Sequence, residues 1–242
     1  MNNVGDIRQR FQSRYDAGHF VKDKSGCNMV EIVGESFIAN EPVIFGIPNQ
    51  DYIDRELMWY NSMSRDVKDI PGKTPDIWSK VSDKNGVINS NYGWCIWSTE
   101  NKNQYTQVLR KLGRDPDTRQ AVMIYNRPSM HADAVHQGRS DFMCTNAVQY
   151  MIRDDTLTAI VQMRSNDVVF GYNNDFAWQD HVAELLQLEL GLRKRKIVWQ
   201  VGSLHVYSRH FWMIDCYIRF GRNLPKEDYI TQRDTTTGGT TL

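Results

Sequence analysis

The sequence predicts an α+β protein in which helices pack against a large β-sheet. Strand-like and helix-like segments occur along the whole chain, and they do not follow the strict strand–helix–strand alternation of a doubly wound fold. Of the 242 residues, 40% are hydrophobic and 11% are aromatic, which is enough for one large core. The chain has no internal repeat and no interior linker rich in Gly, Pro or Ser, so we expect one domain over residues 1–242. Only the polar tail, residues 235–242, has low complexity, and we expect it to be mobile.

The predicted strands are short runs rich in β-branched and aromatic residues, bounded by turn residues. In chain order they cover residues 30–33, 121–125, 147–152, 157–163 and 197–201, the last leading into residues 203–207. The first follows the turn signal Lys24-Ser25-Gly26, and Pro128 ends the second. Residues 153–155 (Arg-Asp-Asp) predict a hairpin turn between the third strand and the fourth.

The predicted helices fall between these strands. Residues 51–67 place apolar side chains at helical spacing, and residues 101–112 form a shorter helix. Residues 174–192 predict the longest helix, with Asn174 as its N-cap and the basic residues 193–196 at its carboxyl end. Residues 210–220 are strongly apolar, so we expect that helix to be buried.

Charge and motif content exclude several functional classes. Lysine and arginine together number 29, as do aspartate and glutamate, so no net field attracts nucleic acid or an anionic membrane. No apolar run approaches the length of about 20 residues that a membrane span needs, and the N-terminus has no secretory pattern, so we expect a cytoplasmic protein. The chain lacks GxGxxG, GxxxxGK[ST] and HExxH motifs, which removes support for dinucleotide, P-loop and zincin sites. No basic, aromatic-interleaved patch predicts direct nucleic-acid binding.

The four cysteines, at 27, 95, 144 and 216, are scattered without a CxxC pair, so we expect free thiols and no metal site. Cys144 is the candidate nucleophile, because polar Thr145 and Asn146 follow it where a structural strand would more often continue with apolar residues. The alternative is a small buried residue, the commonest role of a free cysteine.

Other residues are candidates for binding and proton transfer. Arg164-Ser165 ends a predicted strand and suits a phosphate, since guanidinium donates two parallel hydrogen bonds; the alternative is a solvated loop arginine. His205 and Tyr207 lie two apart on one strand and therefore share a face, which suits either a sugar hydroxyl or a core pair. Glu56 lies in an apolar helix turn, where burial would raise its pKa and favour proton transfer; a surface ion pair is the alternative.

Taken in order, these residues resemble the thymidylate synthase family, and most closely its phage branch, which acts on deoxycytidylate (dCMP). The similarity runs from about residue 22 to residue 217. The matching segments are Asp23-Lys24-Ser25-Gly26, Arg55-Glu56-Leu57, Ile77-Trp78, Asn91-Tyr92-Gly93, Asp117-Thr118-Arg119, Cys144, Gln149, residues 164–168, Gly171, Asp175 and residues 205–208.

The resemblance implies an α+β fold with large mixed sheets that pack back to back in a homodimer. It also implies that each active site takes an arginine from the other subunit, and Arg119 stands at that position. Gln120 replaces a second arginine that the family often has, and Lys24 stands where synthases usually have arginine. The phosphate would then be held by Arg164, Ser165, Lys24 and the partner's Arg119.

The reaction implied by the resemblance is covalent. The Cys144 thiolate adds to C6 of the pyrimidine, C5 attacks the one-carbon unit of 5,10-methylenetetrahydrofolate, and water adds before the thiolate leaves, giving 5-hydroxymethyl-dCMP. The resemblance assigns Glu56 to the water and proton network, Tyr92 to assisting C5 deprotonation or folate release, His205 and Tyr207 to the 3′-hydroxyl, Gln149 to nucleotide orientation, Asp167 to the pterin and Trp78 to the folate.

Asp175 decides the expected base. Synthases have asparagine at this position, which can donate to uracil O4, whereas a carboxylate accepts from the cytosine amino group. The alternative for Asp175 is a carboxylate favoured by a helix N-terminus. Three other functions stay open: a dCMP methyltransferase, a synthase acting on dUMP, and a catalytically silent homologue that serves as a binding subunit of a nucleotide-synthesis complex. The polar tail would close poorly over the site, which agrees with entry of water.

Overall fold

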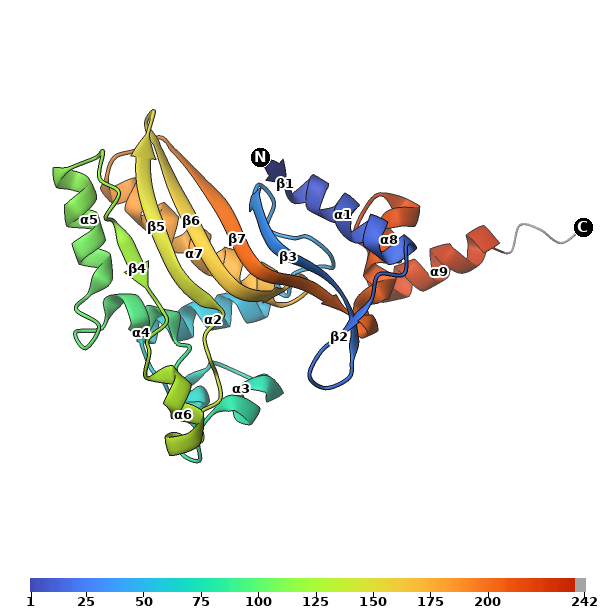
Figure 1. The fold of residues 1–242 in the computed structure, drawn as a ribbon, viewed down its shortest axis with the longest axis horizontal. Coiled ribbons are helices and arrows are strands. Elements are labelled where there is room, and N and C mark those ends of the chain that lie inside the picture. The colour runs from blue at the N-terminus through green and yellow to red at the C-terminus, as the bar shows by residue number, and fades with distance from the viewer. Residues whose placement is uncertain (238–242) are drawn as a thin grey trace, which may run out of the picture.

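A seven-stranded mixed β-sheet organises residues 1–237, the part of the chain that the computed structural model describes (Figure 1). Its strands are β1 (Asn2–Asn3), β2 (Val21–Lys22), β3 (Asn28–Ile38), β4 (Val122–Ile124), β5 (Thr145–Arg153), β6 (Thr156–Asp167) and β7 (Lys194–Tyr207). The strand order is β1-β3-β7-β6-β5-β4, with β2 beside β3. The pairs β6–β7 and β1–β3 are parallel and the others are antiparallel. The predicted fold class, a sheet packed by helices, is confirmed.

Every predicted strand segment lies on a strand of this sheet. The hairpin turn predicted at residues 153–155 joins β5 to β6, with Asp154 and Asp155 both at positive φ (49° and 57°), as a tight hairpin of favourable twist requires. The two segments predicted at residues 197–207 are one unbroken strand, β7. Gly202 permits this, because a Cβ there would lie 2.7 Å from the carbonyl oxygen of Arg164 on β6.

The helices in the described part of the chain include all four predicted ones. Their bounds are α1 (Val4–Asp16), α2 (Gln50–Ser62), α3 (Asp76–Val81), α4 (Tyr92–Trp97), α5 (Gln104–Arg114), α6 (Met130–Gln137), α7 (Gly171–Glu189), α8 (Phe211–Phe220) and α9 (Lys226–Thr237), with short 3₁₀ turns at Val67–Asp69 and Ser208–His210. Helices α1, α3, α4, α6 and α9 were not predicted. Of the tail expected to be mobile, residues 235–237 end α9 and residues 238–242 lie outside the described residues.

Several predicted helix features are wrong. Helix α2 ends five residues early, because Met63 adopts a left-handed conformation and donates its N–H to the Tyr60 carbonyl. Asn174 is not the N-cap of α7, since its own N–H already donates to the Phe170 carbonyl inside the first turn. The basic residues 193–196 do not end that helix but lead into and begin β7, where Arg195 pairs with Asp180 of α7.

The expected burial of α8 is also wrong for most of its length. Only Ile214 and Cys216 are buried there, and Ile218 is 39% exposed. The helix lies beside α1 rather than inside the main core, so only one of its faces is covered.

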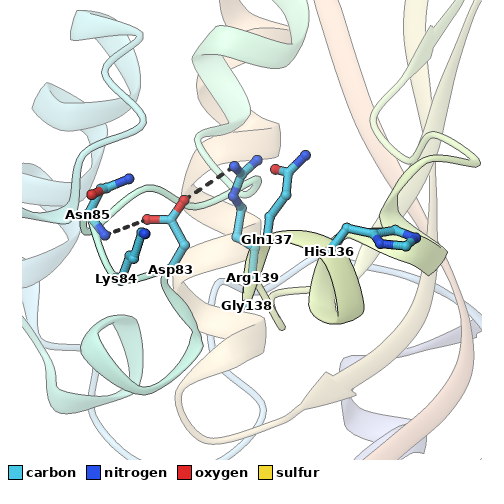
Figure 2. A pocket seen from close by; sticks show the side chains of 7 residues that line it. All are labelled: Asp83, Lys84, Asn85, His136, Gln137, Gly138 and Arg139. Atoms are coloured by element: carbon cyan, nitrogen blue, oxygen red, sulfur yellow. Dashed lines mark hydrogen bonds and ion pairs between the residues drawn. The ribbon is translucent and has the colours of Figure 1, made fainter.

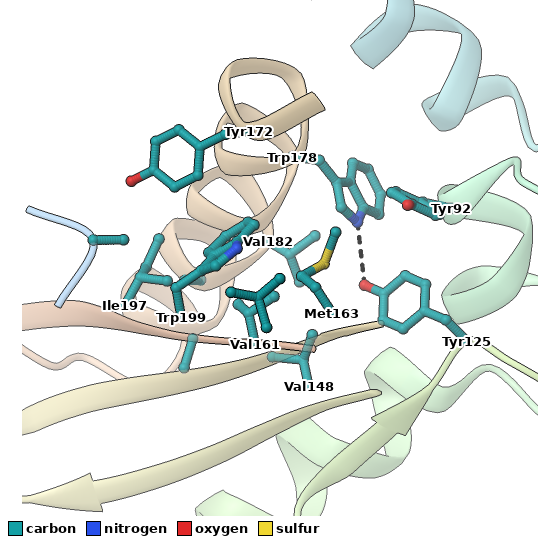
Figure 3. Close-up of a cluster of buried hydrophobic side chains, with 14 of the residues drawn as sticks. Tyr92, Tyr125, Val148, Val161, Met163, Tyr172, Trp178, Val182, Ile197 and Trp199 are labelled. Atoms are coloured by element: carbon teal, nitrogen blue, oxygen red, sulfur yellow. Dashed lines mark hydrogen bonds between the residues drawn. The ribbon is translucent and has the colours of Figure 1, made fainter. Parts of the chain in front are cut away.

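The core lies between the sheet and α7. Cross-strand partners Val148, Val161, Trp199 and Phe37 form one row that points toward this helix and is completely buried. Figure 3 shows Trp178 and Val182 of α7 above this row, with Tyr92 and Tyr125 closing its end. The Trp178 indole donates to the Tyr125 hydroxyl over 3.1 Å, which satisfies a polar atom in a buried aromatic group.

The opposite face of the same strands is uncovered. The next cross-strand row consists of Ser36, Gln200, Gln162 and Ala147, and both glutamines are exposed. Because neighbouring residues of a strand point to opposite faces, the apolar inner row and this polar outer row share one register. The outer face is therefore available to another surface.

Contact between α2 and α4 sets the position of Tyr92. A Cβ at Gly93 would lie 1.8 Å from the Tyr60 carbonyl oxygen, so only glycine permits this approach. The rings of Tyr60 and Tyr92 then stack with centroids 5.2 Å apart. This packing joins α2, which carries Glu56, to α4, which carries Tyr92.

Candidate active site

Cys144 lies directly before β5, at a bend held by its neighbour on the sheet. Its carbonyl accepts from the backbone N–H of Arg164 on β6 over 2.8 Å, and its sulfur lies 3.9 Å from Nη2 of the same arginine. The register shifts between Thr145 and Ala147, an irregularity of the kind that redirects side chains next to functional sites. The sheet thus brings together two residues that are 20 positions apart in the chain.

The Arg164 guanidinium is held by the loop before Cys144. Nε donates to the Met143 carbonyl over 2.9 Å and Nη2 donates to the Phe142 carbonyl over 2.5 Å. Among the described residues no hydrogen bond involves Nη1, so this nitrogen keeps donors for a ligand. The arrangement fits an anion held beside the sulfur.

Burial raises the pKa of the Cys144 thiol to about 11. The negative charge of Asp175 adds to this rise, and the cation of Arg164 opposes it. The thiol is therefore protonated near neutral pH in the unliganded protein. Anything that neutralises the Asp175 carboxylate would make the thiolate easier to form.

Asp175 lies in the second turn of α7 and accepts a side-chain hydrogen bond. Nδ2 of Asn166 donates to its Oδ2 over 2.7 Å. Gly171 leaves room for this bond, since a Cβ there would lie 3.1 Å from that nitrogen. Burial nevertheless raises the pKa of Asp175 to about 7, so its charge changes near neutrality.

Glu56 is 5% exposed on α2, which agrees with the predicted burial rather than with a surface ion pair. The Tyr52 hydroxyl donates to its Oε1 over 2.7 Å, and the indole of Trp78 donates to that hydroxyl over 2.9 Å. Burial and, to a smaller extent, the charge of Asp175 raise the pKa of Glu56 to about 7, against the lowering effect of the Tyr52 hydrogen bond. Two carboxyl groups that repel each other near neutrality favour one shared proton, which suits proton transfer.

The carboxyl ends of the parallel strands β6 and β7 carry the predicted sugar and pterin residues. Ser165 lies opposite Ser203, and Asp167 lies opposite His205. The rings of His205 and Tyr207 pack edge to face with centroids 4.9 Å apart, so they share a face as predicted. Burial raises the pKa of Tyr207, and the charges of Asp167 and Asp23 add to this rise, which places both carboxylates near the phenol.

Three predicted residues lie outside this cluster. Lys24 is exposed in the turn between β2 and β3, next to Asp23. The Gln149 amide donates to the Arg119 carbonyl over 2.9 Å, at the β4–β5 edge. Gln149 pairs with Ile160 and so points away from α7, to the uncovered face. No contact among the described residues joins Arg119 to Cys144 or His205.

Sequence reasoning missed the roles of Tyr52 and Asn166. Tyr52 precedes Glu56 by four residues on a predicted helix, a spacing that brings side chains together, so the signal was present. Asn166 lies within a matching segment, but its partner Asp175 comes from a different element, and no local pattern indicates that contact.

Two surface hollows among the described residues lie elsewhere. One, of about 530 Å³, is lined by residues 83–85 and 136–139; Figure 2 shows Asp83 there accepting from Arg139 over 3.3 Å and from the backbone N–H of Asn85. The other, of about 590 Å³, is lined by Met63, Arg65, Trp94 and residues 97–100. Neither contains a predicted site residue, and in the first the ion pair already neutralises the guanidinium.

Two searches of the described residues bear on other functions. Within residues 1–237 no cluster of three or more His, Cys, Asp or Glu side chains is placed to hold a metal ion. None of the helices in that range combines the length and hydropathy needed to cross a bilayer.

Comparison with known proteins adds independent information. The thymidylate synthase family model matches residues 49–228. A protein of Enterobacteria phage T4 named deoxycytidylate 5-hydroxymethyltransferase is 53% identical over 235 residues, which cover 94% of this chain and 96% of the relative. Proteins of the same name from Enterobacteria phages T6 and T2 are each 53% identical over 234 residues, covering 93% of this chain and 95% of the relative.

The raised pKa of Glu56 predicts a pH-dependent stability. Between its ordinary value of 4.5 and about 7, the folded state binds a proton that the unfolded state has lost. The free energy of unfolding therefore falls as pH rises through this window, and the loss is complete above pH 7. Glu56→Gln cannot titrate, so it should gain on the order of 2 kcal/mol relative to the native protein between pH 5 and pH 8.

Urea unfolding at pH 5, 6, 7 and 8 measures this difference. Glu100→Gln, a change at an exposed carboxylate, is the matched control and should shift little with pH. A Glu56→Gln difference that is the same at pH 5 and pH 8 would contradict the assigned pKa.

Proposed function

This chain belongs to the thymidylate synthase family, and we propose that it acts as a deoxycytidylate 5-hydroxymethyltransferase. It would transfer a one-carbon unit from 5,10-methylenetetrahydrofolate to C5 of dCMP and hydrate it, giving 5-hydroxymethyl-dCMP and tetrahydrofolate. The observation that carries the proposal is the buried carboxylate of Asp175 beside the Cys144 thiol. The names of the three phage relatives support the same activity.

Asp175 selects the base by accepting a hydrogen bond. The exocyclic amine of cytosine donates where uracil presents a carbonyl, so a carboxylate pairs with cytosine and opposes uracil. The Asn166 amide donates to this carboxylate and holds it in one orientation. With its proton, or once N3 of cytosine gains one, Asp175 completes the pairing at N3 as well.

Cys144 is the nucleophile. Its thiolate adds to C6, which makes C5 a carbon nucleophile for the one-carbon unit that the folate supplies. Removal of the C5 proton breaks the bond between the one-carbon unit and the folate nitrogen, so tetrahydrofolate leaves and an exocyclic methylene remains at C5. Water adds to this methylene, and the thiolate leaves from C6. Glu56, with a pKa of about 7 and a hydrogen bond from Tyr52, exchanges protons with the base and with that water. Tyr92, which is buried and lies within the influence of the Asp175 charge, assists proton removal at C5.

The remaining predicted residues bind the substrates. Arg164 and Ser165 hold the phosphate at the end of β6, together with Lys24. His205 and Tyr207 hold the 3′-hydroxyl. Gln149 was predicted to orient the nucleotide, but it points to the opposite face and holds the Arg119 carbonyl instead. Trp78 would pack beside the folate and Asp167 would meet its pterin. The half-buried indole of Trp78 donates to Tyr52 and so links the folate side to Glu56.

A product assay tests the proposal. The purified protein is incubated with dCMP and 5,10-methylenetetrahydrofolate in water enriched in ¹⁸O, and the nucleotide is weighed by mass spectrometry. We expect a hydroxymethyl product that carries the label, since hydration supplies its oxygen, and Cys144→Ala should make none. A methyl product would replace the proposal with a dCMP methyltransferase. Inertness toward both dCMP and dUMP would favour the silent homologue.

Asp175→Asn should reverse the base preference. The new amide oxygen can accept from Asn166, which turns the amide nitrogen toward the base, where it donates to uracil O4. We expect the ratio of kcat/KM for dCMP to that for dUMP to fall by about 100-fold or more, since a mismatched buried hydrogen bond is strongly rejected. Asp180→Asn, on the same helix but paired with Arg195, is the control. An unchanged ratio would refute base reading by Asp175.

We further propose a homodimer in which each site receives Arg119 from the other subunit. Gln149 fixes the Arg119 backbone on the sheet edge, and the outer row of the sheet is uncovered. An arginine presented there is better placed for a neighbouring subunit that packs on this face than for its own Cys144.

Mixed dimers test this arrangement. Cys144→Ala and Arg119→Ala should each be nearly inactive alone, because each site loses the nucleophile or a phosphate ligand. In a randomly reassorted mixture, the heterodimer holds one intact site, so about a quarter of native activity should return. A mixture no more active than its parents would place Arg119 in its own subunit's site.

A further inference from the structure

Three polar side chains on β3 and β7 form a continuous hydrogen-bonded chain. The Ser203 hydroxyl donates to Oε1 of Glu31 and lies 3.3 Å from Nδ1 of His205. Glu31 is the cross-strand partner of His205 in the antiparallel β3–β7 ladder, so their side chains lie on one side of the sheet. Through Ser203, Glu31 on β3, which lies outside the segments that match the family, is linked to His205, which is predicted to bind the sugar.

The chemistry of these groups fixes the direction of each hydrogen bond. A carboxylate can only accept, so the single proton of the Ser203 hydroxyl is directed to Glu31. The serine oxygen then faces Nδ1 with lone pairs, and Nδ1 must carry a proton to make the contact favourable. In the neutral imidazole the proton is therefore on Nδ1, and Nε2 is an acceptor.

The imidazole has little freedom to escape this arrangement. His205 is 6% exposed, its ring packs against Tyr207, and its carbonyl accepts from the Val168 N–H over 3.0 Å. No hydrogen bond to Nε2 is present among the described residues. A buried imidazole with one nitrogen committed and the other unpartnered is a directed acceptor for a ligand.

We propose that Glu31 and Ser203 are positioning residues that hold His205 in the Nδ1-protonated form, so that Nε2 accepts a hydrogen bond from a free 3′-hydroxyl. The inference rests on the proposed function for the identity of the ligand, but the tautomer itself does not. It assigns a specificity: nucleotides that lack the 3′-hydroxyl lose the donor. Glu31 and Ser203 would contribute to this specificity without touching the substrate.

A purely structural role is the alternative, in which the Ser203–Glu31 bond only stabilises the β3–β7 ladder. The two roles differ in their consequences. A structural bond would change stability and affect all substrates alike, whereas a positioning role acts only through the tautomer of His205 and the 3′-hydroxyl.

The tautomer is measured first, by ¹⁵N NMR of the unliganded protein labelled at its histidines, with His205→Asn used to assign the signals. We expect the neutral imidazole to adopt one tautomer, with the proton on Nδ1 and none on Nε2. Ser203→Ala should give a mixture of tautomers, and Glu31→Gln should do so in part, because an amide can also donate to the serine. A native protein with Nε2 protonated and Nδ1 bare would overturn the proposal, as would an unchanged form in Ser203→Ala.

The kinetic test compares dCMP with 2′,3′-dideoxycytidine 5′-monophosphate. Ser203→Ala should lower kcat/KM for dCMP about tenfold, the effect of one misdirected hydrogen bond, and leave that for the dideoxy substrate within about twofold. Ser36→Ala, on the same ladder opposite Gln200, should change neither. Equal losses for both substrates, or no loss for dCMP, would overturn the positioning role.

The two measurements separate this inference from the proposed function. If the native protein converts neither nucleotide, the proposed function fails. The tautomer of His205, compared between the native protein and Ser203→Ala, still tests whether Glu31 and Ser203 position the imidazole. If dCMP is converted but His205 has the opposite tautomer, the positioning role of Glu31 and Ser203 is wrong and the proposed activity stands.

Discussion

The parallel pairing of β6 with β7 is the constraint on which the rest of the structure depends. It places Ser165 beside Ser203 and Asp167 beside His205, at the carboxyl ends of both strands. A slip of one residue would turn every side chain to the other face, so the site exists in only one register. That register is set by the core, because Val161 and Trp199 must both point toward α7 to be buried. Core packing of Val161 and Trp199 thus fixes the alignment of the site residues at the ends of β6 and β7.

Burial of charge is the second organising feature. Glu56 and Tyr92 are buried and Asp175 is partly buried, next to an aromatic cluster in which Tyr60, Tyr92 and Trp178 pack against one another. Enclosure raises the pKa of both carboxyl groups to about 7 and that of the Cys144 thiol to about 11. A fold selected only for stability would not keep two repelling carboxyl groups in such a place. The site is therefore built at some cost to the folded state, offset by the large apolar core.

Elements with strong local signals could be predicted from sequence, and long-range contacts could not. The β5–β6 hairpin has β-branched strands and an Asp-Asp turn, and it forms as expected. The sequence predicts that α7 starts at Asn174, three residues later than it does. The N–H of Asn174 already donates to the Phe170 carbonyl, so the first helical turn begins before Asn174. The basic residues 193–196 could equally end a helix or begin a strand. They begin β7, where Arg195 pairs with Asp180 of α7, a contact that the local sequence does not indicate. The family resemblance indicated Asp175 and His205, but the contacts of Asn166 with Asp175 and of Ser203 with Glu31 form only when separate elements meet.

In the mechanism that we propose, Asp175 links choice of base to activation of the nucleophile. Its negative charge raises the pKa of the Cys144 thiol, so a free carboxylate works against the thiolate that the reaction needs. A cytosine amino group that donates to Asp175 offsets part of that charge and so favours the thiolate where the base is already held. Uracil would set a carbonyl oxygen against the same carboxylate and leave its charge uncompensated. The wrong base is therefore opposed twice, once at binding and again at formation of the nucleophile, by the same side chain.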